Sequence, residues 1–191
     1  MEYTIRTRRF TRSEYERLVE IGFFAPGEPV ELIRGEIMVA EPQGSAHMVA
    51  IGLAHDALRA ALGTGWTVRI QGPIALDEQS EPEPDVALVR GTPRSYLAGH
   101  PTHPALVIEV AESSLRLDRE TKGSLYARAG LCDYWIVNLV DRVVEVYRDP
   151  VADAAAAFGW RYGHVQVLGP LDSASPLAAP AARIAIADLL P

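Results

Sequence analysis

The chain has 191 residues, of which 48% are hydrophobic and 23% charged, and this balance excludes a disordered or a collagen-like protein. Its length, together with the lack of a Pro/Gly/Ser-rich linker, predicts one domain over residues 1–191. The formal net charge of -7 argues against a general nucleic-acid coat protein but not against a nuclease, because carboxylates that hold metal ions add negative charge.

The sequence contains no segment typical of an exported or a membrane protein. No run of about 18 apolar residues is present to span a bilayer, and the N-terminal residues lack the apolar stretch of a signal peptide. We therefore expect a cytoplasmic protein. The single cysteine, Cys132, cannot form an internal disulfide, and its apolar neighbours predict a small thiol buried in the core.

Four arginines lie close together near the N-terminus, namely Arg6, Arg8, Arg9 and Arg12. They form either a local basic patch that guides a polyanion or a solvated arm without such a role. The sequence alone leaves both interpretations open.

The first half of the chain predicts two helices and a hairpin. A capping box predicts a helix over residues 12–21. Two short β-rich runs about Arg34 and Gly35 are typical of a tight hairpin. Residues 45–62 predict a long helix closed by Gly63, and its apolar face is predicted to contain Val49, Leu53, Leu58 and Leu62.

The second half predicts the central sheet and one further helix. Asp118 is predicted to cap a helix that ends at Gly130, and a hairpin about residues 140–142 follows it. β-rich segments bounded by Gly, Pro or Asp supply the sheet, at residues 66–77, 85–91 and 105–111. The chain then continues as an alanine-rich loop, a strand and a closing segment, at residues 151–158, 160–169 and 182–190.

Lys122 is the only lysine in a chain that otherwise uses arginines as its cations. An ammonium is a compact point charge that can lose its proton when buried, whereas a guanidinium stays charged. A lone lysine in such a chain is therefore either an accident of composition or a group that the chemistry requires. Its position in the segment after Glu109 favours the second explanation.

Glu109 lies in a hydrophobic strand. Alternation places it on the same face as Val107 and Ala111, with other apolar side chains on the opposite face. An ionised carboxylate in such surroundings is costly unless it is paired, hydrogen-bonded or bound to a metal ion. Asp85 opens another apolar strand, so the two carboxylates are able to converge at one point, where a divalent cation makes their like charges tolerable.

Two carboxylates, a hard cation and a lysine suit phosphodiester hydrolysis. The metal polarises the phosphate and lowers the pKa of a water, while the lysine positions that water or stabilises charge. Lys122 falls in the first turns of the helix after Glu109, with Asp118 and Tyr126 four residues to either side on one face. Without such partners, an aspartate at a strand start is usually a turn residue and a buried glutamate usually pairs with arginine.

The segments that carry these residues resemble a known family. The PD of EPDVALV, the EVA of VIEVAESS and a displaced lysine resemble the PD-(D/E)XK nuclease superfamily. The resemblance runs nearly end to end and is to its Uma-type branch of restriction endonuclease-like proteins (DUF820). It also includes VELIRGEI, the histidine of SAHMVAIGLA, DRETKGSLYARAG, DYWIVNL and RVVEVYR.

This resemblance implies both a fold and an activity. The fold is α/β (α+β), with a restriction-endonuclease-like core in which helices flank a mixed central β-sheet and additional β-hairpins are present. The activity is that of a nuclease dependent on Mg²⁺ or Mn²⁺, with DNA as the expected nucleic acid and a homodimer as the expected assembly. In the resemblance Asp85 and Glu109 match metal ligands, Lys122 matches the catalytic lysine, and Glu31 matches a further acidic ligand.

The sequence departs from the superfamily pattern at one position. Two residues after Glu109, where the superfamily usually has lysine, this chain has Ala111. In branches with a relocated lysine the following helix supplies it, and Lys122 is the lysine available there. We therefore expect a migrated active site.

Other polar residues have weaker claims to the site. His47, Ser114 and Tyr126 are candidates for contacting the substrate or orienting the ligands, although a helix histidine is usually satisfied or exposed and a serine here favours capping. His100 and His103 flank Pro101 without a further ligand set, so a zinc site is not expected.

Two alternatives to a DNA nuclease remain at this stage. A catalytically silent module on the same fold would bind nucleic acid or protein without turnover, and the alanine at position 111 keeps this possibility open. A metal-dependent enzyme acting on RNA or on another phosphoester would use the same residues, because the sequence contains no evident base-reading element.

Overall fold

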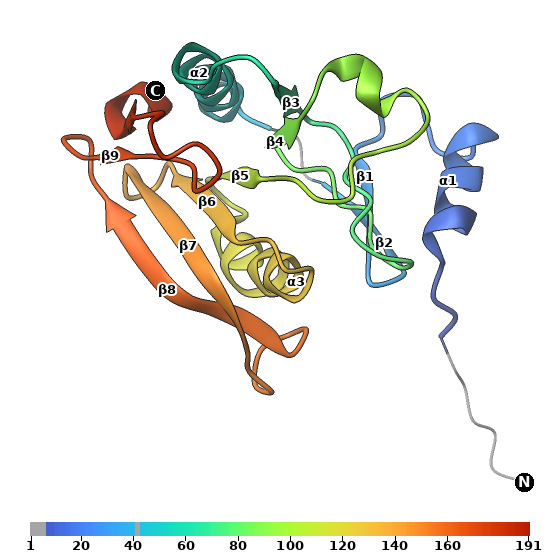
Figure 1. Ribbon diagram of the computed structural model, residues 1–191. Coiled ribbons are helices and arrows are strands. Elements are labelled where there is room, and N and C mark those ends of the chain that lie inside the picture. The colour runs from blue at the N-terminus through green and yellow to red at the C-terminus, as the bar shows by residue number, and fades with distance from the viewer. Residues whose placement is uncertain (1–6, 41–42) are drawn as a thin grey trace, which may run out of the picture.

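The computed structural model describes residues 7–40 and 43–191, so that Arg6 of the N-terminal arginine group lies outside the described residues. The described chain forms a mixed α+β fold built on a six-stranded sheet of order β3-β4-β5-β6-β7-β8, as Figure 1 shows. The strands run over Trp66–Ile70, Val86–Arg90, Leu106–Ala111, Asp133–Asn138, Val143–Ala152 and Trp160–Leu168. β5 and β6 are parallel and the other neighbours are antiparallel, which confirms the expected mixed central sheet.

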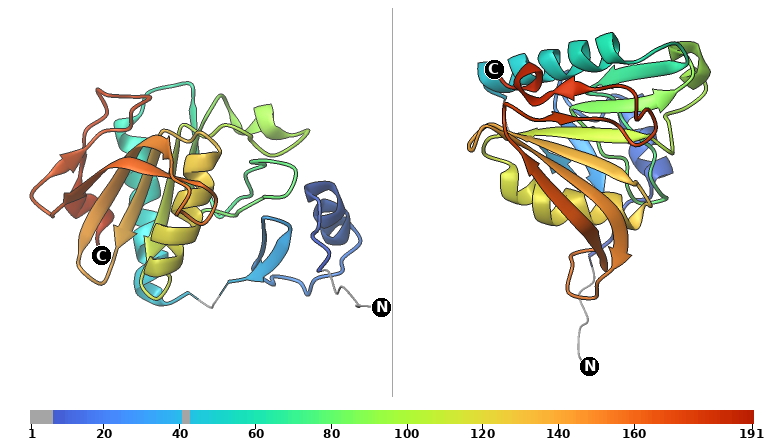
Figure 2. Two further views of the ribbon diagram at one scale, coloured as in Figure 1. Left: turned by 90° about the horizontal axis from the view of Figure 1, so that it is seen from below. Right: turned by 60° about the vertical axis from the view of Figure 1, so that its left-hand side comes forward.

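Helices cover the two faces of this sheet. Helix α2 (Ser45–Ala61) packs on one face, where its buried side chains join those of Leu106, Ile108 and Val110. The π-helical turn η2 (Leu117–Lys122) and helix α3 (Gly123–Arg128) lie on the other face. The right-hand view of Figure 2 shows the sheet between α2 and α3. The alternation predicted around Glu109 is therefore confirmed, because successive side chains of β5 enter two different cores.

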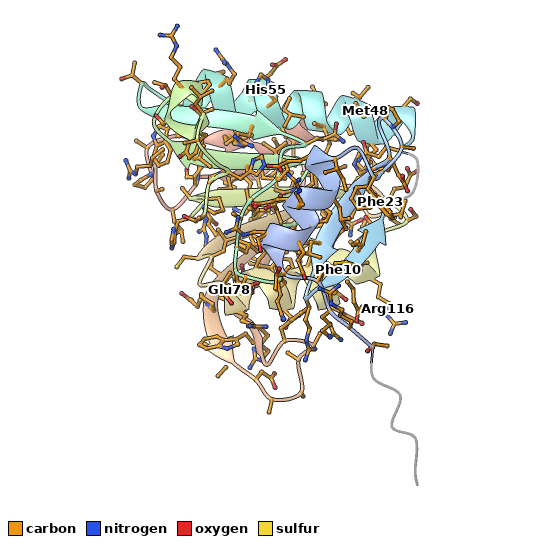
Figure 3. The ribbon with its side chains drawn as sticks, turned by 90° about the vertical axis from the view of Figure 1, so that its right-hand side faces the viewer. Phe10, Phe23, Met48, His55, Glu78 and Arg116 are labelled. Atoms are coloured by element: carbon orange, nitrogen blue, oxygen red, sulfur yellow. The ribbon has the colours of Figure 1, made fainter. Side chains whose placement is uncertain are left out.

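The N-terminal part of the chain adds a helix and a hairpin beside the sheet. Helix α1 (Arg12–Glu20) has the predicted capping box, and the hairpin of β1 (Val30–Ile33) and β2 (Glu36–Val39) turns at Arg34 and Gly35 as predicted. The hydroxyl of Tyr15 donates to the carbonyl of Val30 at 2.8 Å. Figure 3 shows α1 lying beside this hairpin, which fixes the position of β1.

Short elements complete the fold. They are η1 (Pro93–Tyr96), the pair β9 (Ser173–Ala174) and β10 (Ile184–Ala185), and η3 (Ile186–Leu189). The pair and η3 follow β8, and η3 packs against α2. Among the described residues, no helix is long and apolar enough to cross a membrane.

The predicted face of the long helix is partly wrong. Val49 is 51% exposed, whereas the buried residues of α2 are Ala50, Ile51, Ala54 and Leu58. Alanines allow the helix to pack closely against the sheet, so the buried stripe is rotated from the one that the larger side chains predicted. Burial therefore depended on the fit to the sheet and not on hydrophobicity alone.

Two predicted segment boundaries change as well. The strand expected over residues 66–77 ends at Ile70, because Gln71 has a left-handed backbone (φ 44) that an extended strand does not contain. The loop expected over residues 151–158 is shorter, since β7 continues to Ala152 and pairs there with Trp160.

The predicted cap at Asp118 is wrong. Helical structure begins at Leu115, and the amide of Asp118 donates to the carbonyl of Ser114 at 3.0 Å. The hydroxyl of Ser114 in turn donates to the Asp118 carboxylate at 2.6 Å. Asp118 thus lies inside the helix, buried to 2% exposure, although the helix does end near Gly130 as predicted. The sequence around Asp118 did not indicate that the helix begins three residues earlier, at Leu115.

The prediction that Cys132 is a core thiol is also wrong. Cys132 is exposed, although its neighbours Leu131 and Asp133 are buried. The residue lies in the connection between α3 and β6, directly before the fully buried strand begins. Apolar neighbours in the sequence therefore did not specify which side chain faces the core.

Candidate active site

A groove of about 690 Å³ lies where β1, the start of α2, the start of β4, the end of β5 and the turn η2 approach one another. Its polar lining is mainly carboxylate. Side chains with ionisable or amide groups in this lining include Glu31, Gln43, His47, Asp85, Glu109 and Lys122. These residues come from segments far apart in the sequence, so the sheet and its flanking elements create the groove.

Strand pairing brings Asp85 and Glu109 together as predicted. β4 and β5 are antiparallel with Val86 opposite Ile108, and this register places the residue before β4 beside Glu109. The amide of Asp85 donates to Oε2 of Glu109 at 3.3 Å, and the amide of Val110 donates to Oδ2 of Asp85 at 2.8 Å. Backbone donors thus fix both carboxylates next to each other.

Lys122 reaches the same carboxylates from the η2 turn. Its Nζ lies 3.2 Å from Oε1 of Glu109 and 3.3 Å from Oε1 of Glu31. Glu31 points into the groove from β1, where its other oxygen accepts from the amide of Glu83 at 3.1 Å. Lys122 is only 8% exposed, so the ammonium is buried between two carboxylates. The sole lysine of the chain therefore lies at the predicted position.

The helical residues around Lys122 support Glu109. The hydroxyl of Tyr126 donates to Oε1 of Glu109 at 2.7 Å, and Tyr126 is fully buried. Ser114 does not contact Asp85 or Glu109, because its hydroxyl donates to Asp118 instead. Lys122 closes a π-helical turn, a distortion that is often found at functional sites.

His47 binds Asp85 from the first turn of α2. Its Nε2 lies 3.1 Å from Oδ2 of Asp85, and its side chain is mostly buried. The helix places this histidine at the groove, so a role near Asp85 is supported over that of an exposed surface residue. His100 and His103 do not line the groove.

The polar groove residues that sequence reasoning missed include Gln43, Gln71 and Glu83, together with Glu28 and Glu112. Glu83 had a signal, because EPEPD places it two residues before Asp85. The two glutamines had none, since an amide in a loop gives no pattern and their contacts join residues 28 and 42 positions apart.

Burial of so many ionisable groups shifts their proton affinities. Burial raises the pKa of Glu109 to about 8, with Lys122 opposing the shift and Asp85 adding to it. Burial likewise raises the pKa of Asp118 to about 6. Burial disfavours the charged form of Lys122, but the neighbouring carboxylates of Glu109 and Glu31 outweigh it and raise the pKa of Lys122 above its ordinary value. The groove therefore favours a cation among its carboxylates.

The carboxylate oxygens of Asp85 and Glu109 are the type of donor that a hard cation such as Mg²⁺ takes. Among residues 7–40 and 43–191, no three or more His, Cys, Asp or Glu side chains are gathered as metal ligands. A zinc site usually needs three or four such ligands, whereas Mg²⁺ is commonly held by one or two carboxylates together with water and substrate phosphates. Asp85 and Glu109 fit the second kind of site, and the oxygens of all three acidic residues, Glu31 included, already accept protein hydrogen bonds or ion pairs.

The N-terminal arginines within the described residues are paired with carboxylates. Arg8 contacts Glu14, Arg9 lies 2.8 Å from Glu36, and Arg12 contacts Glu16. Because acidic partners neutralise these guanidinium groups, this segment does not present an unopposed basic patch. The groove gains its positive charge from Lys122 instead.

Comparisons with known proteins found a matching family and a similar solved structure. Residues 12–187 match the family model Uma2, described as "Putative restriction endonuclease". A crystal structure of a putative nuclease belonging to DUF820 from Anabaena variabilis ATCC 29413 is similar, with a TM-score of 0.65 and 19% sequence identity. The similarity covers 90% of this chain and 96% of that one. No curated protein matches the chain.

Proposed function

The chain belongs to the Uma2 family of putative restriction endonucleases, and from this membership and the groove we propose that it is a divalent-metal-dependent nuclease. The observation that carries the proposal is the junction of Asp85, Glu109 and Lys122, which meet from two strands and a helical turn. We further propose DNA as the substrate, and a single domain over residues 1–191 that acts as a homodimer in the cytoplasm.

In the proposed site, Asp85 and Glu109 would hold Mg²⁺ or Mn²⁺, with Glu31 as a further ligand. The cation would supply Lewis acidity to a phosphate and would lower the pKa of a bound water. Asp85 brings an oxygen fixed by the amide of Val110, so little rearrangement of the backbone is needed for binding.

Lys122 has two roles in this proposal. While paired with Glu109 and Glu31, its ammonium neutralises charge that would otherwise repel the substrate phosphate. During hydrolysis the same ammonium positions the attacking water or stabilises charge on the phosphate oxygens. Tyr126 holds Oε1 of Glu109, which limits the positions that this carboxylate adopts.

One observation favours a second candidate, a module that binds nucleic acid or protein without turnover. Among the described residues there is no ready cluster of three metal ligands, and Lys122 occupies the space between Glu31 and Glu109. On this alternative the Lys122 ion pairs would hold the fold together and would not take part in a reaction.

Cleavage assays test the proposed function directly. Purified protein is incubated with plasmid, linear and single-stranded DNA and with RNA, in Mg²⁺, Mn²⁺ or a chelator, beside a Lys122→Ala variant prepared in the same way. Metal-dependent cutting by the wild type and not by the variant supports the nuclease. Equal cutting by both proteins indicates a contaminant, and binding without cutting supports the silent module.

A further inference from the structure

Two glutamine side chains form a chain of hydrogen bonds that ends on Asp85. Nε2 of Gln71 donates to Oε1 of Gln43 at 2.9 Å, and Nε2 of Gln43 donates to Oδ1 of Asp85 at 3.3 Å. The other carboxylate oxygen, Oδ2, interacts instead with His47 and the amide of Val110. Each oxygen of Asp85 therefore has its own set of neighbours.

The Asp85 carboxylate and the NH₂ group of Gln71 together determine which way the Gln43 amide faces, because a carboxylate only accepts. An amide has an NH₂ group that donates and an oxygen that accepts. Because Gln43 uses its oxygen to accept from Gln71, its NH₂ group is directed at Asp85. The reversed amide would place two NH₂ groups together and an oxygen against the carboxylate. Gln71 thus holds the Gln43 amide in the orientation that donates to Asp85.

The backbone of Gln71 gives an independent reason to look for a function. Its φ of 44° is in the left-handed region, which residues other than glycine rarely adopt, and its amide donates to the carbonyl of Asp85 at 3.0 Å. Glycine would fit this backbone without strain, and glycine is in fact the next residue, Gly72. What glutamine adds at this exposed position is its side-chain amide.

We propose that Gln71 and Gln43 are positioning residues, which hold the Asp85 carboxylate in the orientation that binds the divalent cation. This inference rests on the proposed function and deepens it, because it assigns a role to two side chains that lie outside the proposed metal ligands. Outer hydrogen-bond partners of metal ligands commonly affect metal affinity in this way.

The Gln71→Gly variant separates positioning from folding. It removes the amide while relaxing the backbone, so we expect the melting temperature in chelator to stay within about 3 °C of the wild type. We expect the affinity for Mn²⁺, measured by calorimetry, to fall about 10- to 100-fold, and the Mg²⁺ concentration needed for half-maximal cleavage to rise by a similar factor. Unchanged Mn²⁺ affinity would overturn the inference.

A double-mutant cycle tests the order of the chain. Gln43→Ala should weaken Mn²⁺ binding at least as much as Gln71→Gly, and the double variant should be no worse than Gln43→Ala, because Gln71 acts through Gln43. Effects that multiply would show that Gln71 acts by another route and would contradict the proposal. Gln71→Asn, which tolerates a left-handed backbone but has a shorter side chain, should behave like Gln71→Gly.

Arg142→Gly is the matched control. Arg142 also has a left-handed backbone, at φ 55°, but lies in the turn between β6 and β7 and does not line the groove. The Mn²⁺ affinity of Arg142→Gly should equal that of the wild type. If Arg142→Gly loses as much Mn²⁺ affinity as Gln71→Gly, relaxation of the backbone explains the loss. A wild type that binds no Mn²⁺ and cuts nothing would reject the proposed function itself, whereas a metal-dependent wild type with a normal Gln71→Gly variant would reject only the glutamine chain.

Discussion

Nζ of Lys122 lies 3.2 Å from Oε1 of Glu109, so the one lysine of the chain is paired with a glutamate buried in the central sheet. The two residues come from adjacent elements, β5 and the η2 turn, which are connected by residues 112–116. The same ammonium also contacts Glu31 from β1. Lys122 therefore joins the N-terminal hairpin to the sheet at the groove.

Replacement of Lys122 by arginine is expected to remove activity while largely preserving the fold. Arginine keeps the positive charge beside Glu109 and Glu31 but changes its shape and cannot give up its proton. We expect a loss of about 100-fold or more in kcat, with a melting temperature close to that of the wild type. Kinetics on the preferred substrate and thermal unfolding measure the two effects. Full activity in Lys122→Arg would contradict the assigned role. Arg128→Ala serves as the control, because it removes a partly exposed cation from the adjoining helix α3.

Glu109→Gln is expected to weaken metal binding without unfolding the protein. The change removes a buried carboxylate, while Lys122 keeps Glu31 as a partner. In chelator we expect the free energy of unfolding to be unchanged or higher, because the change relieves the repulsion between Glu109 and the carboxylates of Asp85 and Glu31. Addition of Mn²⁺ should raise the melting temperature of the wild type but not of the variant. A variant that unfolds in chelator would instead indicate that the ion pair with Lys122 is structural.

Tyr126→Phe is expected to affect Glu109 through a single lost hydrogen bond. Without the hydroxyl, Oε1 of Glu109 is held by Lys122 alone, and we expect about a 10-fold loss of Mn²⁺ affinity. Tyr162→Phe is the matched control, because its buried hydroxyl donates to the carbonyl of Leu131 instead. Calorimetry on both variants checks the prediction. Equal losses in the two would mean that general packing, not the contact with Glu109, is responsible.

Glu81 is expected to make stability depend on pH. Burial and repulsion by Glu16 raise its pKa to about 7, above the 4.5 of an ordinary glutamate. The folded state thus binds the proton more strongly, so the free energy of unfolding falls as pH rises from about 4.5 to about 7 and this contribution is constant above that. After allowance for solvent screening the effect is on the order of 1 kcal/mol. Denaturant unfolding at pH 5 and pH 8 should show a smaller difference for Glu81→Gln than for the wild type, and equal differences would refute the assignment.

Cys132 is expected to react with a thiol reagent in the folded protein. Its side chain is exposed and lies outside the residues that line the groove. Labelling with an aromatic disulfide should reach one equivalent without denaturant, and the labelled protein should cleave as fast as the unlabelled one. A thiol that reacts only after unfolding would restore the original prediction of a core residue.

Local sequence patterns predicted much of the fold and part of the site. Alternation in β5 placed Glu109 on the face away from Ile108, and the pair Arg34 and Gly35 marked the first hairpin, because side-chain direction and turn geometry depend on neighbouring residues. The identity of Lys122 as the only lysine singled out this residue before any contact was known.

Only the tertiary structure decided how these residues meet. The register of β4 and β5 joins Asp85 to Glu109, and the approach of β1 to η2 joins Glu31 to Lys122. The exposure of Cys132 depended on packing in the same way. The sequence by itself determined the alternation of side chains along β5 and the position of the first hairpin, because these follow from local geometry. Which distant side chains come within hydrogen-bond distance was decided by the packing of the sheet against its helices and hairpin, since that packing sums contacts over the whole chain.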